Sequence, residues 1–203
     1  MIFRGESVKW PVVLGHAIHA IVLLLPTLLF CGRNGFDFAI CLFALGVVLS
    51  ACVESNSVAP YFEPCGGQVC DSLALWVCAA TGAGILLMLW VAQIEHAFVR
   101  HPSVLEIAVG AALLILGTTM RIVAIRTLKQ SFVSDIRVNR QRVRHGIYAW
   151  MKHPSEIGTV FFVIGATLLI GATRSTLAAA SILIPIAIWR MWREDVAWSG
   201  VPR

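Results

Sequence analysis

The sequence predicts an all-α fold, a polytopic transmembrane bundle of about five to six helices that ends in a C-terminal helical hairpin. Hydrophobic residues make up 58% of the 203 residues and charged residues only 13%, and the mean hydropathy is +0.81. The apolar residues gather in blocks close to the roughly 20 residues that a helix needs to cross the hydrocarbon layer. Half of all lysines and arginines lie in one stretch, from Arg121 to Lys152, an asymmetry typical of membrane proteins.

Six apolar blocks follow one another along the chain, and we expect a helix in each of them. Four have membrane length, and the last two are separated by a short turn, which predicts the hairpin. The blocks are Trp10–Phe30, Phe36–Val53, Ser72–Ile94, Ser103–Ile125, Ile157–Ala172 and Thr176–Trp192.

The start of the chain superficially resembles a signal peptide, because Arg4 and Lys9 precede the first block. That block is long, however, and Cys31-Gly-Arg-Asn after it is not an Ala-x-Ala-like cleavage site. We therefore expect an uncleaved first helix and a single membrane domain over 1–203.

The basic residues predict the orientation of the helices. Eight of them lie from the end of the fourth block to just before the fifth: Arg121, Arg126, Lys129, Arg137, Arg140, Arg142, Arg144 and Lys152. The positive-inside rule places that segment, and hence both termini, in the cytoplasm. The segment Glu54–Asp71 should then lie inside as well, although it holds no lysine or arginine. The net charge of +5 accordingly indicates membrane lipids as partners, and the sequence holds no nucleic-acid-binding motif.

Cysteine and histidine give no metal site in this reading. Cys65 and Cys70 form a disulfide if their loop faces an oxidising compartment and stay thiols if it faces the cytosol. His16 and His19 share one helix face without further ligands nearby. Small residues at Gly110, Gly117, Gly165 and Gly171 instead indicate close packing between helices.

Two basic-His-Pro-Ser tetrads stand 52 residues apart, and their surroundings differ. In the first, Arg100-His101-Pro102-Ser103, Ser103 and Glu106 have the spacing of a capping box. Pro102 also disfavours a helical conformation at His101. The first tetrad is therefore explained by the start of a helix at the membrane surface.

The second tetrad, Lys152-His153-Pro154-Ser155, follows a long basic segment, "KQSFVSDIRVNRQRVRHG". Gly146 can turn the chain just before Tyr148, because glycine adopts backbone angles that other residues avoid. The residues alone favour a ligand-binding loop here and leave open a plain helix start with a basic flank.

The stretch "GIYAWMKHPSEIG", followed by "TVFFVIGATLLIG" and "WRMWRED", resembles the isoprenylcysteine carboxyl methyltransferases and the related phospholipid methyltransferases. That pattern has a Gly-x-Tyr, then Arg-His-Pro with a later Gly, an apolar hairpin, and an Arg with an acidic pair. The resemblance covers roughly Arg121–Asp195. It divides the domain into N-terminal transmembrane helices over 1–120 and, over 121–203, a cofactor-binding loop, the hairpin and a catalytic segment.

The resemblance implies S-adenosylmethionine as cofactor and a lipophilic or lipid-linked methyl acceptor, with the site facing the cytoplasm. Arg190 is expected to hold an acceptor carboxylate and Glu194 to attract the sulfonium. The implied catalytic residues are thus Arg190 and Glu194, and the implied cofactor-binding residues are Arg140, Val143, Gly146, Tyr148, His153, Pro154 and Glu194.

Several positions depart from the family pattern, among them Arg142-Val143 in place of Leu-Val and Asp195 as the second acid. Lys152 stands where an arginine is usual, Glu156 replaces an aromatic residue, and Arg140 replaces a histidine. Arg190 and Glu194 also have a plainer interpretation, an i,i+4 pair that anchors the helix end. Two other functions stay open: an NADPH-dependent membrane reductase of similar architecture, and a catalytically inactive lipid-binding membrane protein.

Overall fold

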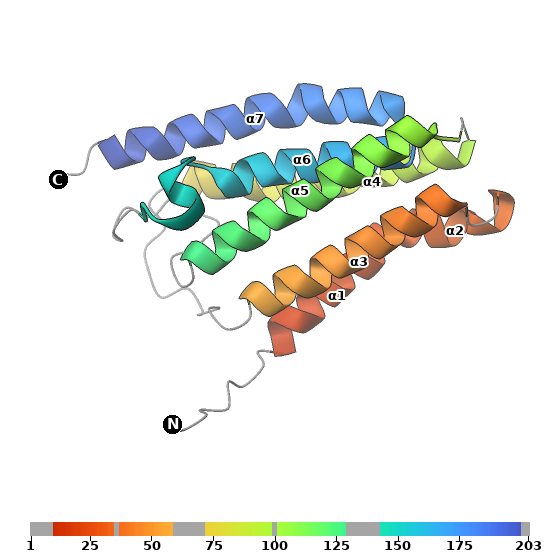
Figure 1. Ribbon diagram of the computed structural model, residues 1–203, viewed down its shortest axis with the longest axis horizontal. Coiled ribbons are helices and arrows are strands. Elements are labelled where there is room, and N and C mark those ends of the chain that lie inside the picture. Colours follow the sequence, from red (N-terminus) through yellow and green to blue (C-terminus); the bar gives the residue numbers. More distant parts are fainter. Residues whose placement is uncertain (1–9, 35–36, 59–71, 99–100, 129–142, 200–203) are drawn as a thin grey trace.

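The structure is a computed structural model (Figure 1), and it describes residues 10–34, 37–58, 72–98, 101–128 and 143–199. Within these ranges the chain forms seven α-helices, one 3-10 helix and no strand, which confirms the all-α prediction. The elements are α1 (Trp10–Leu23), α2 (Leu25–Asn34), α3 (Phe38–Val58), α4 (Ser72–Phe98), α5 (Val104–Leu128), η3 (Gly146–Ala149), α6 (Pro154–Leu169) and α7 (Thr173–Ser199). Predictions for Arg140, Cys65 and Cys70 fall outside the described residues.

The helices run back and forth along one axis, so that the start of α1 and the end of α7 lie at the same end of the bundle (Figure 1). Four of them are long and apolar enough to cross a membrane: α3, Trp76–Phe98 of α4, α5 and Thr173–Val196 of α7. Val12–Leu23 and α6 are shorter apolar helices. The protein therefore has the helices of a multi-pass membrane protein.

The first apolar block, predicted as a single helix, is divided into α1 and α2 at Leu24. The cause is Pro26, which has no N–H to donate to the carbonyl of Val22, four residues earlier. The indole Nε1 of Trp90 donates to that carbonyl instead, at 2.9 Å. The side-chain amide of Gln93 replaces the backbone hydrogen bond of the next turn. It donates to the carbonyl of Leu23 at 2.8 Å and accepts from the N–H of Thr27 at 3.1 Å.

Helices α5 and α6 approach each other more closely than side chains would allow. A Cβ atom at Gly117 would overlap backbone atoms of Phe162 and Gly158, and one at Gly110 would overlap the backbone of Leu169. A Cβ atom at Gly165 would likewise overlap backbone atoms of α5. The predicted packing is confirmed for Gly110, Gly117 and Gly165, and it fixes where the N-terminus of α6 lies. The prediction is wrong for Gly171, which has φ +70° and forms the turn between α6 and α7 against Pro102.

An ion pair joins α3 to α5 within the bundle. The guanidinium of Arg121 donates to both carboxylate oxygens of Glu54, and its Nη1 donates to the hydroxyl of Thr159 on α6. Charged groups in membrane helices are costly unless they find such partners. Arg121 therefore helps to hold α3, α5 and α6 together.

At the other end of the bundle, the carboxylate of Asp37 contacts two histidines. Its Oδ2 lies 3.1 Å from His96 Nε2 and 3.1 Å from His101 Nδ1. Close by, the N–H of Ser103 donates to the Glu106 carboxylate at 2.8 Å and the Glu106 N–H donates to the Ser103 hydroxyl at 3.3 Å. This is the predicted capping box, so the first tetrad does start a helix.

The replacement Asp37→Asn is expected to lower the melting temperature of the detergent-purified protein at pH 7 by about 2 °C. Burial raises the pKa of the Asp37 carboxyl, but the N–H of Ile40 and the two histidines outweigh burial and hold it below its usual 3.8. A carboxyl with a lowered pKa stabilises the fold above pH 3.8 and loses that contribution as the pH falls through its folded-state pKa. The difference between variant and wild type should therefore shrink between pH 4 and pH 2. An unchanged difference at pH 2 would contradict this assignment.

Candidate functional site

The second tetrad lies at the end of the bundle that holds the start of α1 and the end of α7, where η3 leads into α6 beside the last turns of α7 (Figure 1). Gly146 has φ +61°, and a Cβ atom there would stand 3.2 Å from the Thr127 side chain. The chain therefore turns at Gly146 as predicted. The turn brings Tyr148 and His153 back against the bundle.

His153 is the most enclosed polar side chain of the site, with 8% of its surface exposed. It precedes Pro154, which occupies the first position of α6 and suits a helix start because it lacks an N–H. Nδ1 of His153 is 3.1 Å from Oε2 of Glu194 on α7. The other nitrogen, Nε2, is buried and has no hydrogen-bond partner among the described residues.

The surroundings of this Nε2 atom form a candidate position for a ligand. The nearest carboxylate oxygen is Oδ1 of Asp195, at 3.6 Å, which is beyond hydrogen-bond distance. Asp195 also pairs with Lys152 through Oδ2, at 3.2 Å. Buried polar atoms without partners are rare, so a polar ligand atom placed near Nε2 would satisfy it.

Tyr148 on η3 is half-buried and close enough to the carboxylates of Glu194 and Glu156 for their charges to act on it. Burial, together with these two charges, raises the pKa of the Tyr148 phenol well above its usual value. The phenol is therefore protonated at physiological pH, and it offers the site a neutral O–H donor.

Arg190 reaches across from α7 to α6. Its Nη1 lies 2.9 Å from Oε1 of Glu156, and the two side chains are 22% and 24% exposed. Glu194, four residues after Arg190, bonds to His153. The partners of both residues thus lie on the other side of the hairpin, which argues against the simple i,i+4 anchor.

The structure brings together five of the predicted site residues: Tyr148, His153, Pro154, Arg190 and Glu194. Val143 lies half-buried in the segment before η3, and Gly146 forms the turn.

Glu156 was noted from the sequence only as a departure, yet it contacts the predicted catalytic arginine. One feature of the sequence could have indicated this contact. A carboxylate in the first turn of an apolar membrane helix is costly unless a cation lies close to it, and the other helix of the hairpin carries arginine near its end.

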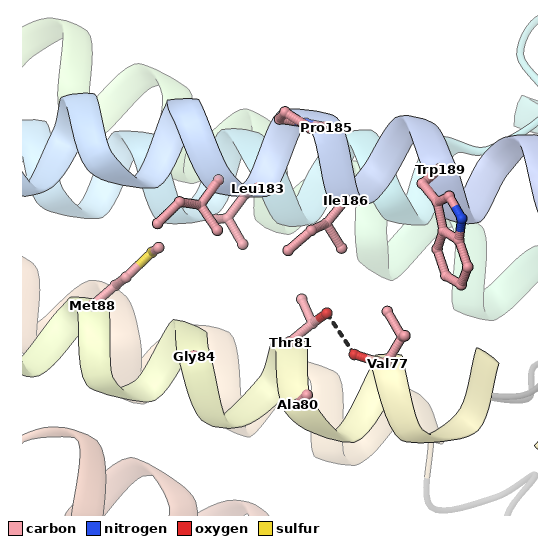
Figure 2. Close-up of a pocket in the computed structure, with 10 residues that line it drawn as sticks. Val77, Ala80, Thr81, Gly84, Met88, Leu183, Pro185, Ile186 and Trp189 are labelled. Carbon is pink, nitrogen blue, oxygen red and sulfur yellow. Dashed lines mark hydrogen bonds between the residues drawn. The ribbon is translucent and has the colours of Figure 1, made fainter. Parts of the chain in front are cut away.

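An apolar groove of about 520 Å³ runs between α4 and α7 and reaches Trp189. Figure 2 shows Met88, Ala80 and Val77 of α4 facing Leu183, Ile186 and Trp189 of α7. Trp189 directly precedes Arg190 in the chain. The groove therefore extends along α7 as far as the residue before Arg190.

Comparison with known proteins matches residues 108–198 to the isoprenylcysteine carboxyl methyltransferase (ICMT) family. Protein-S-isoprenylcysteine O-methyltransferase B of Arabidopsis thaliana is 29% identical over 93 residues, which are 44% of this chain and 45% of that relative. The protein-S-isoprenylcysteine O-methyltransferase of Saccharomyces cerevisiae is 34% identical over 65 residues, 30% of this chain and 27% of the relative. The matches thus span less than half the length of these relatives. No solved structure matches the chain significantly.

Proposed function

We propose that the chain is an integral-membrane methyltransferase of the isoprenylcysteine carboxyl methyltransferase family. The match of residues 108–198 to that family, and the relatives that share this region, support the proposal. The protein uses S-adenosylmethionine and acts on a lipophilic acceptor. The names of the relatives make a prenylated cysteine carboxylate the first acceptor to test. The single observation that carries the proposal is the buried Nε2 of His153, unpartnered among the described residues and enclosed by Glu194 and Asp195.

The residues present fit S-adenosylmethionine, which supplies a methyl group on a sulfonium cation. His153 Nε2 offers a buried hydrogen-bonding position to its polar parts. The carboxylates of Glu194 and Asp195 give the site a negative potential that favours a cation, and such an interaction strengthens near the low-dielectric bundle. Tyr148 adds a neutral donor.

We assign the methyl acceptor to the side of the site opposite the proposed position of S-adenosylmethionine. Its hydrocarbon part fits the apolar groove between α4 and α7, and its polar end then lies near Arg190. Methyl transfer is an in-line displacement, so most of the acceleration that the protein supplies comes from holding the two reactants in line. The groove also excludes water from the acceptor.

The proposed orientation places the site at the cytoplasmic face. Support comes from the basic stretch from Arg121 to Lys152 and the position of η3 at the same end of the bundle as the start of α1 and the end of α7 (Figure 1). Accessibility of a cysteine introduced at Trp150, which is 90% exposed, to a membrane-impermeant thiol reagent in sealed vesicles would decide the orientation.

Calorimetric titration of S-adenosylmethionine and S-adenosylhomocysteine into the detergent-purified protein tests the proposal. We expect both to bind the wild type, and we expect His153→Ala to weaken binding about tenfold to a hundredfold, because a buried hydrogen bond to a charged ligand contributes roughly 1.5–3 kcal/mol.

The matched control is His101→Ala, which changes the corresponding histidine of the first tetrad at the far end of the bundle and should leave affinity unchanged. A folded wild type that binds neither compound would refute the proposal. Titration of NADPH would then test the reductase alternative.

A further inference from the structure

Glu156 and Arg190 form a pair that is partly shielded from water. The Nη1–Oε1 distance is 2.9 Å, and about three quarters of each side chain is covered. An exposed ion pair contributes little, whereas a hydrogen bond between charged groups is stronger when solvent is excluded. The pair therefore differs from a surface contact.

Two further features hold the Glu156 carboxylate in place. It lies in the first turn of α6, where the helix dipole favours negative charge. The charge of Arg121, on the neighbouring α5, also attracts it. The first turn of α6 is in turn positioned by glycine packing, because a Cβ atom at Gly158 would meet the carbonyl of Gly117 at 2.8 Å. Glu156 is thus presented to Arg190 by a rigid backbone.

The resemblance implies that Arg190 binds the carboxylate of an acceptor. In this structure Arg190 instead binds the carboxylate of Glu156, which belongs to the chain itself. An acceptor carboxylate that approaches Arg190 must displace Glu156 or share one guanidinium with it. Two carboxylates at one cation repel each other. An acceptor with an uncharged polar end meets no such repulsion.

We propose that Glu156 determines acceptor specificity by occupying Arg190, so that the site favours lipophilic acceptors whose polar end carries no negative charge. This inference rests on the proposed function, since it concerns the acceptor of that same site. It assigns a specificity role to a residue that differs from the aromatic residue usual at this position.

The test measures equilibrium binding of two probes, N-acetyl-S-farnesylcysteine and its carboxamide, to detergent-purified wild type and to Glu156→Gln. The probes share the apolar chain and differ in charge at the polar end. We expect the wild type to bind the carboxylate no more tightly than the carboxamide. We expect Glu156→Gln to bind the carboxylate about tenfold more tightly than the wild type does, with no change for the carboxamide.

Glu106→Gln is the control variant, because Glu106 is also a first-turn glutamate but lies at the far end of the bundle. It should not change the affinity for either probe. Titration of S-adenosylmethionine into the same preparations reports separately on the proposed function, and Glu106→Gln should leave that affinity within about twofold of wild type.

Three results would overturn the inference. The first is a wild type that already prefers the carboxylate tenfold or more, which can be measured even if the variant does not fold. The second is a Glu156→Gln variant that binds both probes with unchanged or equally changed affinity. The third is failure of both proteins to bind either probe while S-adenosylmethionine binds normally, since Glu156 then governs no acceptor of this kind.

Discussion

Replacing Arg190 with alanine is expected to lower methyl transfer about 100-fold or more without unfolding the protein, the size of effect seen when a positioned charged group is removed from a reaction site. The variant loses the cation nearest to the proposed acceptor. It also leaves the carboxylate of Glu156 without the partner that lies 2.9 Å away. The measurement is transfer of labelled methyl groups from S-adenosylmethionine into lipid-extractable product, with the protein in vesicles.

Arg174→Ala is the matched control for Arg190→Ala, because Arg174 is an exposed arginine at the beginning of the same helix and bonds Glu95 through its backbone N–H. Activity should survive in this control. The double variant Arg190→Ala with Glu156→Gln separates two roles. If Arg190 served only to neutralise Glu156, activity would return in the double variant, and the acceptor role of Arg190 would be disproved.

The second large effect is on stability. Gly117→Ala is expected to destabilise the protein by about 2–3 kcal/mol, because the added methyl group overlaps backbone atoms of α6 that cannot move independently. Gly82→Ala is the matched control, since Gly82 is also within a helix but has no atom within 4 Å of the added group. That replacement should be neutral or stabilise by up to about 1 kcal/mol.

Thermal unfolding of both glycine variants in the same detergent checks this contrast. Equal melting temperatures for Gly117→Ala and Gly82→Ala would mean that α5 and α6 are not held in direct backbone contact. The Gly117 variant should also bind S-adenosylmethionine more weakly, because the displaced helix carries His153 at its N-terminus.

Much of the fold follows from hydropathy, because each membrane helix must be apolar over its own length, whichever neighbours it packs against. The capping box of Ser103 and Glu106 could likewise be predicted from the sequence, since both residues lie within one helical turn. The division of the first block was not predicted, although Pro26 is visible in the sequence. Whether a proline bends or ends a helix depends on the groups that take over the freed carbonyls, here Trp90 and Gln93 on another helix.

That the residues of the candidate site lie together could be predicted, but their contacts only in part. Gly-x-Tyr, His-Pro and the Arg with its acidic pair identified Tyr148, His153, Arg190 and Glu194. The partner of Arg190 was not predictable, because it depends on the rotation of α6 about its axis relative to α7. That rotation is set by glycine contacts between α5 and α6, which involve backbone atoms that hydropathy does not describe.

The length of α6 bears on how an acceptor is delivered. Its 16 residues span about 24 Å at 1.5 Å per residue, less than the roughly 30 Å of a typical hydrocarbon layer. Unless the bilayer thins locally, the N-terminus of α6 and the histidine before it therefore lie at or below the boundary of the acyl chains. Under the proposed function, a membrane-dissolved acceptor reaches the site by diffusing in two dimensions. The rate then depends on the mole fraction of acceptor in the bilayer. Adding inert lipid should therefore lower the rate, as diluting a substrate in water does.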